Sequence, residues 1–167
     1  MPARPLVMYP DPRLKLRASP VEHFDKALEA LAQDLMDTVV AAPAIGLSAC
    51  HIGVQQRLVA IRLADDALMR LYVNPQILWM SPETRREQEG SVSMPGIAEE
   101  VERPARIGLT WNTLSGSEER AEADGFLAVV LQHEIDQLDG IFWLDRLSRL
   151  KRERAIRRYQ KLRGAGG

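Results

Sequence analysis

The spacing of apolar residues predicts a helix near the N-terminus. Within residues 21–40, apolar side chains recur three and four positions apart, at Phe24, Leu28, Leu31, Leu35 and Val39. A helix turns every 3.6 residues, so this spacing places them on one face that packs on a core. We expect the helix to end before Pro43. The preceding stretch "YPDPRL" is expected to be extended or turning, because each proline biases the residue before it away from helix.

The pattern then changes to short stretches that are rich in β-branched and aromatic residues. These stretches are separated by Asn-Pro, Ser-Pro, Pro-Gly and Arg-Pro dipeptides, which are typical of turns. We therefore predict antiparallel strands and loops up to about residue 115. The predicted strands are "RLVAIRL" (57–63), "RLYVNPQIL" (70–78) and "RIGLTW" (106–111).

Two further helices are predicted in the last third of the chain. The first covers about residues 126–139 and stops at Gly140, a residue type common just after a helix. The second covers about residues 146–163. Helix, strands, helix, helix, without an internal repeat or a linker, predicts one α+β domain over residues 1–167.

Composition and charge restrict the class of protein. The chain has 22 Lys and Arg against 23 Asp and Glu, so its net charge of −1 indicates no partner. Cys50 is the only cysteine, which rules out an internal disulfide and permits a reducing compartment. Prolines interrupt the apolar core that a signal peptide needs, and no stretch reaches the ~18 apolar residues of a membrane span. We expect a cytoplasmic protein with neither a membrane nor DNA as a partner.

The central helix carries a buried acid. Glu134 lies on the apolar stripe of this helix, where an ionised carboxylate costs several kcal/mol unless it is paired or neutralised. His133 and Gln137 are one turn apart on the adjacent edge, where a zinc-binding H-E-x-x-H motif has two histidines. This half-motif alone is equally consistent with a glutamate at the rim of the core and a hydrogen-bonded interior histidine.

Three segments resemble the motifs of peptide deformylases. "AIGLSACHIGV" (44–54) resembles G-φ-G-L-A-A-x-Q-φ-G, where φ is apolar, "EGSVSMPG" (89–96) resembles E-G-C-L-S-x-P-G, and "QHEIDQLDG" (132–140) resembles Q-H-E-x-D-H-L-x-G. They occur in the order of the family. With "YPDPRL", "VNP" and "VERP", the resemblance covers nearly the whole chain. It implies antiparallel strands packed around a central helix that carries the third motif, and a basic C-terminal helix.

The resemblance also implies a chemistry. Peptide deformylases remove the formyl group from the N-terminal formyl-methionine of new proteins, using iron or zinc held by a cysteine and two histidines. In this chain those ligand positions are Ser91, His133 and Gln137. The acid–base glutamate of the family falls on Glu134, and the glutamine that stabilises the oxyanion falls on His51. Only His133 and Glu134 match the family's catalytic set.

These substitutions weaken the expected metal site. Ser91 offers a neutral hydroxyl in place of a thiolate, and Gln137 offers an amide oxygen in place of an imidazole nitrogen. Changes around the ligands alone reduce metal affinity ~10–100-fold, so losing two ligands costs at least ~10²–10⁴. We expect no cofactor, or zinc or iron at reduced affinity. A general base contributes only ~10²–10⁴ in rate, so Glu134 without a metal predicts an inactive deformylase.

Two hypotheses for His51 stay open. In the first, His51, His133 and Glu134 form a relocated metal site, with Cys50 as a less favoured donor, and the protein is an active metal-dependent hydrolase of the deformylase type. In the second, His51 fills the emptied pocket and makes a hydrogen bond to Glu134 or Gln137.

The expected partners follow from the same residues. A groove around Ile45, Gly46, His51, Gly90 and Val92 is expected to bind a formylated or methionine-like peptide end. The C-terminal helix has nine basic residues between positions 146 and 163, with Glu153 as its one acid. It is expected to pack on the domain through an apolar stripe, and the resemblance adds docking to the ribosome. The stripe consists of Leu147, Leu150, Ile156 and Tyr159.

Overall fold

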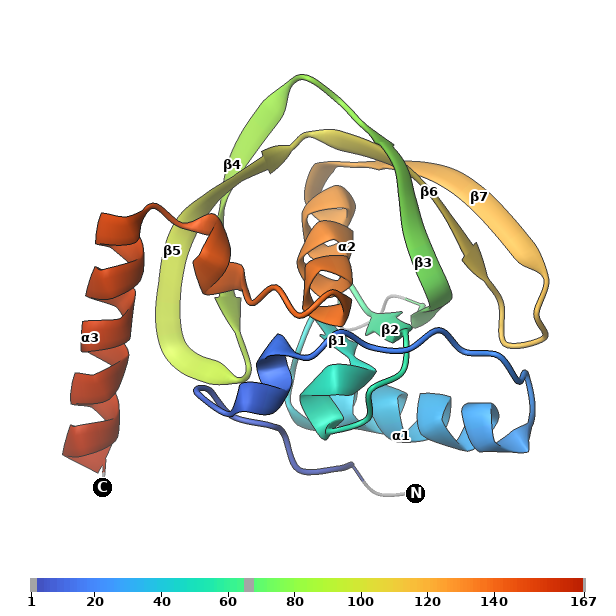
Figure 1. The fold of residues 1–167 in the computed structure, drawn as a ribbon, viewed down its shortest axis with the longest axis horizontal. Helices are drawn as coiled ribbons and strands as arrows, with labels where there is room; N and C mark the ends of the chain where they lie inside the picture. The colour runs from blue at the N-terminus through green and yellow to red at the C-terminus, as the bar shows by residue number, and fades with distance from the viewer. Residues whose placement is uncertain (1–2, 65–67, 167) are drawn as a thin grey trace.

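The computed structural model describes residues 3–64 and 68–166 and has an α+β architecture, as predicted (Figure 1). Its helices are α1 (Lys26–Ala41), α2 (Gly125–Leu138) and α3 (Arg149–Gly166), with the short 3-10 turns η1 (Pro12–Lys15), η2 (Ala49–Ile52) and η3 (Trp143–Arg146). Its strands are β1 (Gly46–Ser48), β2 (Leu58–Ile61), β3 (Arg70–Met80), β4 (Thr84–Ser91), β5 (Met94–Pro104), β6 (Arg106–Asn112) and β7 (Glu118–Asp124).

The strands form two antiparallel sheets. One has the order β1-β2-β3-β6-β7, and the other pairs β4 with β5. Both sheets surround α2, which lies at the centre of the molecule (Figure 1). The predicted central helix with strands around it is therefore confirmed.

Helix α2 is buried on every side. Residues 128 through 138 are all buried, so Glu134 lies inside the protein and not at a rim. The bounds of the helix agree with the prediction to within one residue. Gly140 follows it with a φ of +77°, a backbone conformation that glycine adopts without strain.

The N-terminal region differs in detail from the prediction. Helix α1 begins at Lys26, because the Asp25 side chain accepts a hydrogen bond from the Leu28 N–H and caps the helix there. Phe24 therefore precedes the helix and is half-buried. The "YPDPRL" stretch contains η1, where Asp11 accepts a hydrogen bond from the Arg13 N–H.

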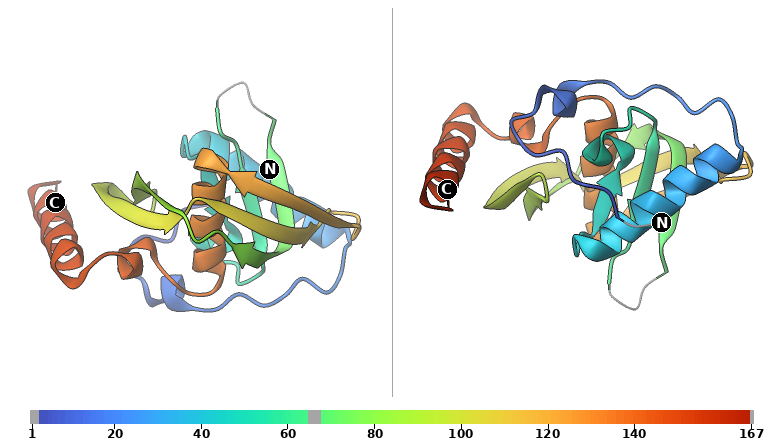
Figure 2. Two further views of the ribbon diagram at one scale, coloured as in Figure 1. Left: turned by 90° about the horizontal axis from the view of Figure 1, so that it is seen from above. Right: turned by 90° about the horizontal axis from the view of Figure 1, so that it is seen from below.

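Helix α3 packs against β5 at one end of the molecule (Figures 1 and 2). It begins at Arg149, later than predicted, because η3 and the extended Leu147 precede it. Leu147 and Tyr159 are buried, but Leu150 is 68% exposed, so this part of the predicted stripe is wrong. Within the described residues, no helix combines the length and the hydropathy needed to cross a membrane.

Candidate functional site

A cavity of about 390 Å³ lies where α2, β1 and the end of β4 meet. Its walls are mainly apolar. The predicted groove residues Ile45, Gly46, Gly90 and Val92 all line it. The polar side chains of His51, Ser91, His133 and Glu134 also line it.

Two glycines allow the backbone to approach closely. A Cβ at Gly46 would lie 3.1 Å from Val130 Cγ1 and 3.3 Å from Glu134 Oε2. A Cβ at Gly90 would lie only 2.7 Å from the Ile97 carbonyl oxygen. A side chain at either position would therefore force its neighbours to shift.

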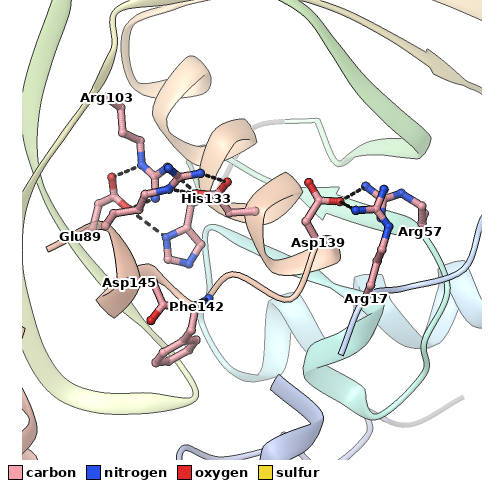
Figure 3. A network of polar contacts seen from close by, with 10 residues as sticks. Arg17, Arg57, Glu89, Arg103, His133, Asp139, Phe142 and Asp145 are labelled. Atoms are coloured by element: carbon pink, nitrogen blue, oxygen red, sulfur yellow. Dashed lines mark hydrogen bonds and ion pairs between the residues drawn. The ribbon is translucent and has the colours of Figure 1, made fainter. Parts of the chain in front are cut away.

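His133 is oriented by a buried ion network (Figure 3). Its Nδ1–H donates to Glu89 Oε1 at 3.0 Å. Arg103, only 4% exposed, donates to the same carboxylate through Nε (2.6 Å) and Nη2 (3.0 Å). Burial opposes the charged forms of His133 and Glu89, yet the hydrogen bond to Glu89 and the charges of Glu134 and Glu89 raise the pKa of His133. The bonds from His133 and Arg103 lower the pKa of Glu89.

The network continues across α2. Arg103 Nη1 donates to Asp136 Oδ2 at 2.9 Å, and Arg146 donates to both oxygens of Asp136 at 2.9 and 2.7 Å. The network thereby joins β4, β5 and η3 to the central helix α2. The sequence analysis did not single out Glu89 or Arg103. The available signal was their place in the "EGSVSMPG" and "VERP" segments.

Glu134 has an unpartnered oxygen. The residue is 4% exposed, and Oε1 has no hydrogen-bond partner among the described residues. Burial raises the pKa of Glu134 to about 7, although the nearby His133 acts against this rise.

His51 is held by Ser48. The ring is 1% exposed, and its Nδ1 accepts a hydrogen bond from the Ser48 backbone N–H at 3.1 Å and lies 3.0 Å from Ser48 Oγ. The nearest oxygen of Glu134 is 3.7 Å from Nδ1, beyond hydrogen-bonding distance. The amide of Gln137 donates to the Leu14 carbonyl instead. The hypothesis of a hydrogen bond from His51 to Glu134 or Gln137 is therefore wrong. Burial, aided by the charge of His133, lowers the pKa of His51 to about 3, so its ring is neutral.

Gln137 does not face the cavity. Its Nε2 donates to the Leu14 carbonyl at 2.6 Å, and the residue is absent from the cavity lining. The expectation that the side chains of His133 and Gln137 point the same way is wrong, because the amide of Gln137 extends to Leu14 in the N-terminal segment. Ser91 does line the cavity, where its Oγ accepts a hydrogen bond from the Ser93 N–H.

These donors do not fit iron or zinc. Of the three positions that the resemblance assigns to ligands, only His133 brings an imidazole to the cavity. Within residues 3–64 and 68–166, no three His, Cys, Asp or Glu side chains are arranged to hold a metal. Cys50 is buried, and burial raises the pKa of its thiol to about 11, which disfavours the thiolate that a metal requires.

Comparison with known proteins decides the family. The model of the polypeptide deformylase family matches residues 3–153. This chain belongs to the polypeptide deformylase family. A protein of Brucella melitensis named "Peptide deformylase-like" is 57% identical to this chain, and the match covers 97% of this chain and 99% of the relative. A "Peptide deformylase" of Phenylobacterium zucineum is 43% identical over 96% and 97%.

The fold of this deformylase-family chain also agrees with solved structures. The crystal structure of a peptide deformylase from Legionella pneumophila superimposes with a TM-score of 0.91 at 35% identity, covering 98% of this chain and 97% of the other. The α+β fold around a central helix is therefore that of the family.

Proposed function

We propose that this protein binds the N-terminal end of a peptide with an apolar first residue, such as formyl-methionine, without hydrolysing it at deformylase rates. The observation that carries the proposal is the orientation of Gln137, whose amide is bonded to Leu14 and not directed at His133. Together with the hydroxyl of Ser91, this leaves His133 as the one strong donor of the family's ligand set.

The cavity supports binding of this kind of ligand. Apolar walls with a few polar groups are typical of small-ligand sites, and the cavity volume of about 390 Å³ lies in the range of roughly 300–1,000 Å³ that such sites have. Hydrolysis requires an activated water, and a catalytic metal activates water by lowering its pKa from about 15.7 to about 7. Glu134 as a general base supplies ~10²–10⁴ in rate and cannot compensate for that loss.

The printed names of two relatives bear on where this chain belongs within the family. The Brucella protein, named "Peptide deformylase-like", is more similar to this chain than the Phenylobacterium protein, named "Peptide deformylase". This supports placing the chain with the relatives named "Peptide deformylase-like".

A binding assay combined with product analysis tests the proposal. The purified protein is titrated with a formyl-methionyl peptide, and released formate is measured in the same samples. We expect saturable binding without formate. Formate release at ordinary enzymic rates would contradict the proposal. Leu150→Ala, a change at an exposed residue far from the cavity, is the control and should bind as the wild type does.

The relocated metal site makes a different prediction. If His51, His133 and Glu134 hold a metal, the wild type should contain near-stoichiometric metal, and His51→Ala should lose it while its circular dichroism stays unchanged. That result would refute the proposal. Metal content equally low in both proteins would support it.

Helix α3 supports a second candidate, docking on the ribosome. Four of its basic side chains form neither an ion pair nor a hydrogen bond with any residue that the structure describes: Lys151, Arg152, Arg157 and Lys161. Such cations are free to contact RNA phosphates, and binding of this kind weakens steeply with salt.

Co-sedimentation with ribosomes tests this candidate. Replacing Lys151, Arg157 and Lys161 by glutamine should reduce pelleting, and added salt should do the same to the wild type. The matched control replaces Arg86, Arg106 and Arg120, which are exposed and lie on strands, by glutamine. This control variant should pellet as the wild type does. Equal pelleting of both triple variants would contradict docking through α3.

A further inference from the structure

A second cavity of about 390 Å³ lies where the N-terminal segment, η3 and α3 meet. It shares no lining residue with the main cavity that holds His133. Three segments that are far apart in the sequence build it. Seen from below the view of Figure 1, η1 lies beside η3, and α3 follows η3 (Figure 2). The volume is within the range of roughly 300–1,000 Å³ that small-ligand sites have.

One wall of the second cavity is apolar and aromatic. The rings of Tyr9 and Phe142 stack with their centroids 5.5 Å apart and an angle of 10° between their planes. Leu14 and Leu144, which are buried, and Ile156, which is half-buried, complete this wall. A wall of this kind favours a ligand with an apolar body, because contact with the wall removes apolar surface from water.

Arg152 is a half-buried cation in the same cavity. Its backbone N–H bonds to the Ser148 carbonyl, but its guanidinium forms neither an ion pair nor a hydrogen bond with any described residue. Arg57, Arg85 and Arg103, which are also not exposed, each pair with a carboxylate. A guanidinium that has lost part of its water loses free energy unless it gains a partner. Arg152 can therefore gain from binding an anion.

Two further donors line the second cavity. The Lys15 ammonium and the Tyr9 hydroxyl have no partner among the residues that the structure describes. Burial raises the pKa of Tyr9, and the charge of Asp145 adds to this rise. The hydroxyl therefore keeps its proton at neutral pH and is able to donate.

The two acids of the second cavity limit the charge of its ligand. Both oxygens of Asp11 already accept hydrogen bonds from Arg13, and Asp145 Oδ2 accepts one from a backbone N–H at 3.2 Å. The two cations and two carboxylates of the lining have a net charge of zero. A dianion such as a phosphate is repelled by these carboxylates about twice as strongly as a monoanion. The lining therefore favours a carboxylate over a phosphate.

We propose that the second cavity binds a small organic carboxylate with an apolar body. The carboxylate lies on Arg152 and Lys15, and the apolar part lies against Tyr9 and Phe142. Arg152 supplies most of the affinity, because a guanidinium donates two parallel hydrogen bonds to a carboxylate. This inference goes beyond the proposed function and does not depend on it.

Titration with related small molecules tests the ligand class. Phenylacetate has a carboxylate and an apolar body, phenylacetamide lacks the charge, and acetate lacks the ring. We expect phenylacetate to bind saturably at millimolar concentration or below, ~10-fold or more tightly than the other two. Phenyl phosphate should bind more weakly than phenylacetate. No saturable binding of phenylacetate, equal binding of phenylacetamide, or tighter binding of phenyl phosphate would overturn the proposal.

Three variants test the role of Arg152. Arg152→Gln should weaken the binding of phenylacetate ~10-fold or more, and Arg152→Lys, which retains a cation, should stay within ~3-fold of the wild type. The matched control is Arg157→Gln, which removes an exposed cation of the same helix outside the cavity and should change nothing. Equal affinity of Arg152→Gln and the wild type would overturn the proposal.

NMR spectra locate the bound phenylacetate. In 15N-labelled protein, the amide signals that shift on titration should belong to residues of the second cavity, such as Leu144, Asp145 and Ile156. Val129 and Val130, which line the main cavity, should not shift. Shifts confined to the main cavity would overturn the proposal. The same spectra, recorded without ligand, check that each variant folds.

Discussion

At the residue scale, Gln137 shows what a motif does and does not specify. Helical spacing placed it one turn from His133 on a buried helix, and this is correct. The direction of its side chain depends on the Leu14 carbonyl, 123 positions away in the chain. No local pattern contains that information. The contact between Ser48 and His51, three positions apart, is by contrast local and follows from the backbone of η2.

Gln137→Ala should destabilise the protein. The change leaves the buried Leu14 carbonyl without its donor, a loss worth about 1–3 kcal/mol of unfolding free energy. Urea denaturation measures it, with the exposed Gln160→Ala as the control, which should change little. An unchanged free energy of unfolding in Gln137→Ala would mean that the bond to Leu14 does not form.

Cys50 should be unreactive in the folded protein. Burial raises its pKa to about 11, so at pH 8 the thiol is protonated and also inaccessible to reagents. An aromatic disulfide reagent should label no thiol in the native protein and one thiol per chain in denaturant. Rapid labelling of the native protein would contradict the buried position of Cys50.

At the element scale, the predictable elements are those with an apolar pattern. Helix α2 and strands β2, β3 and β6 were recognised because they carry core residues. Strands β4 and β7 were not, since most of their side chains are polar and exposed. Their pairing with β5 and β6 defines them, and pairing is a long-range property.

Arg103 is the residue that joins β5 to β4 and α2. Arg103→Met should leave the carboxylates of Glu89 and Asp136 buried without their shared cation, which costs about 3–5 kcal/mol. Arg106→Met, which breaks an exposed ion pair with Glu83, is the matched control and should cost less than about 1 kcal/mol. Similar unfolding free energies for the two variants in urea would show that the buried network contributes little.

At the scale of the whole molecule, the motifs predicted which residues share the cavity, because they belong to a fold that the family determines. All but one of the site positions that the resemblance implied line it, and the exception is Gln137. Those that do are Ile45, Gly46, His51, Gly90, Ser91, Val92, His133 and Glu134. Whether those residues hold a metal depends on side-chain directions that the motifs do not encode. The molecule is also uneven in charge, with basic α3 at one end and the acidic edge strand β7 at the other (Figure 2).

Elemental analysis tests the central claim most directly. The protein is purified anaerobically, supplied with iron and zinc in turn, freed of excess metal by gel filtration and analysed for metal per chain. The geometry of Gln137, Ser91 and His51 predicts far less than one metal per chain for both ions. Near-stoichiometric iron or zinc that survives gel filtration would contradict it.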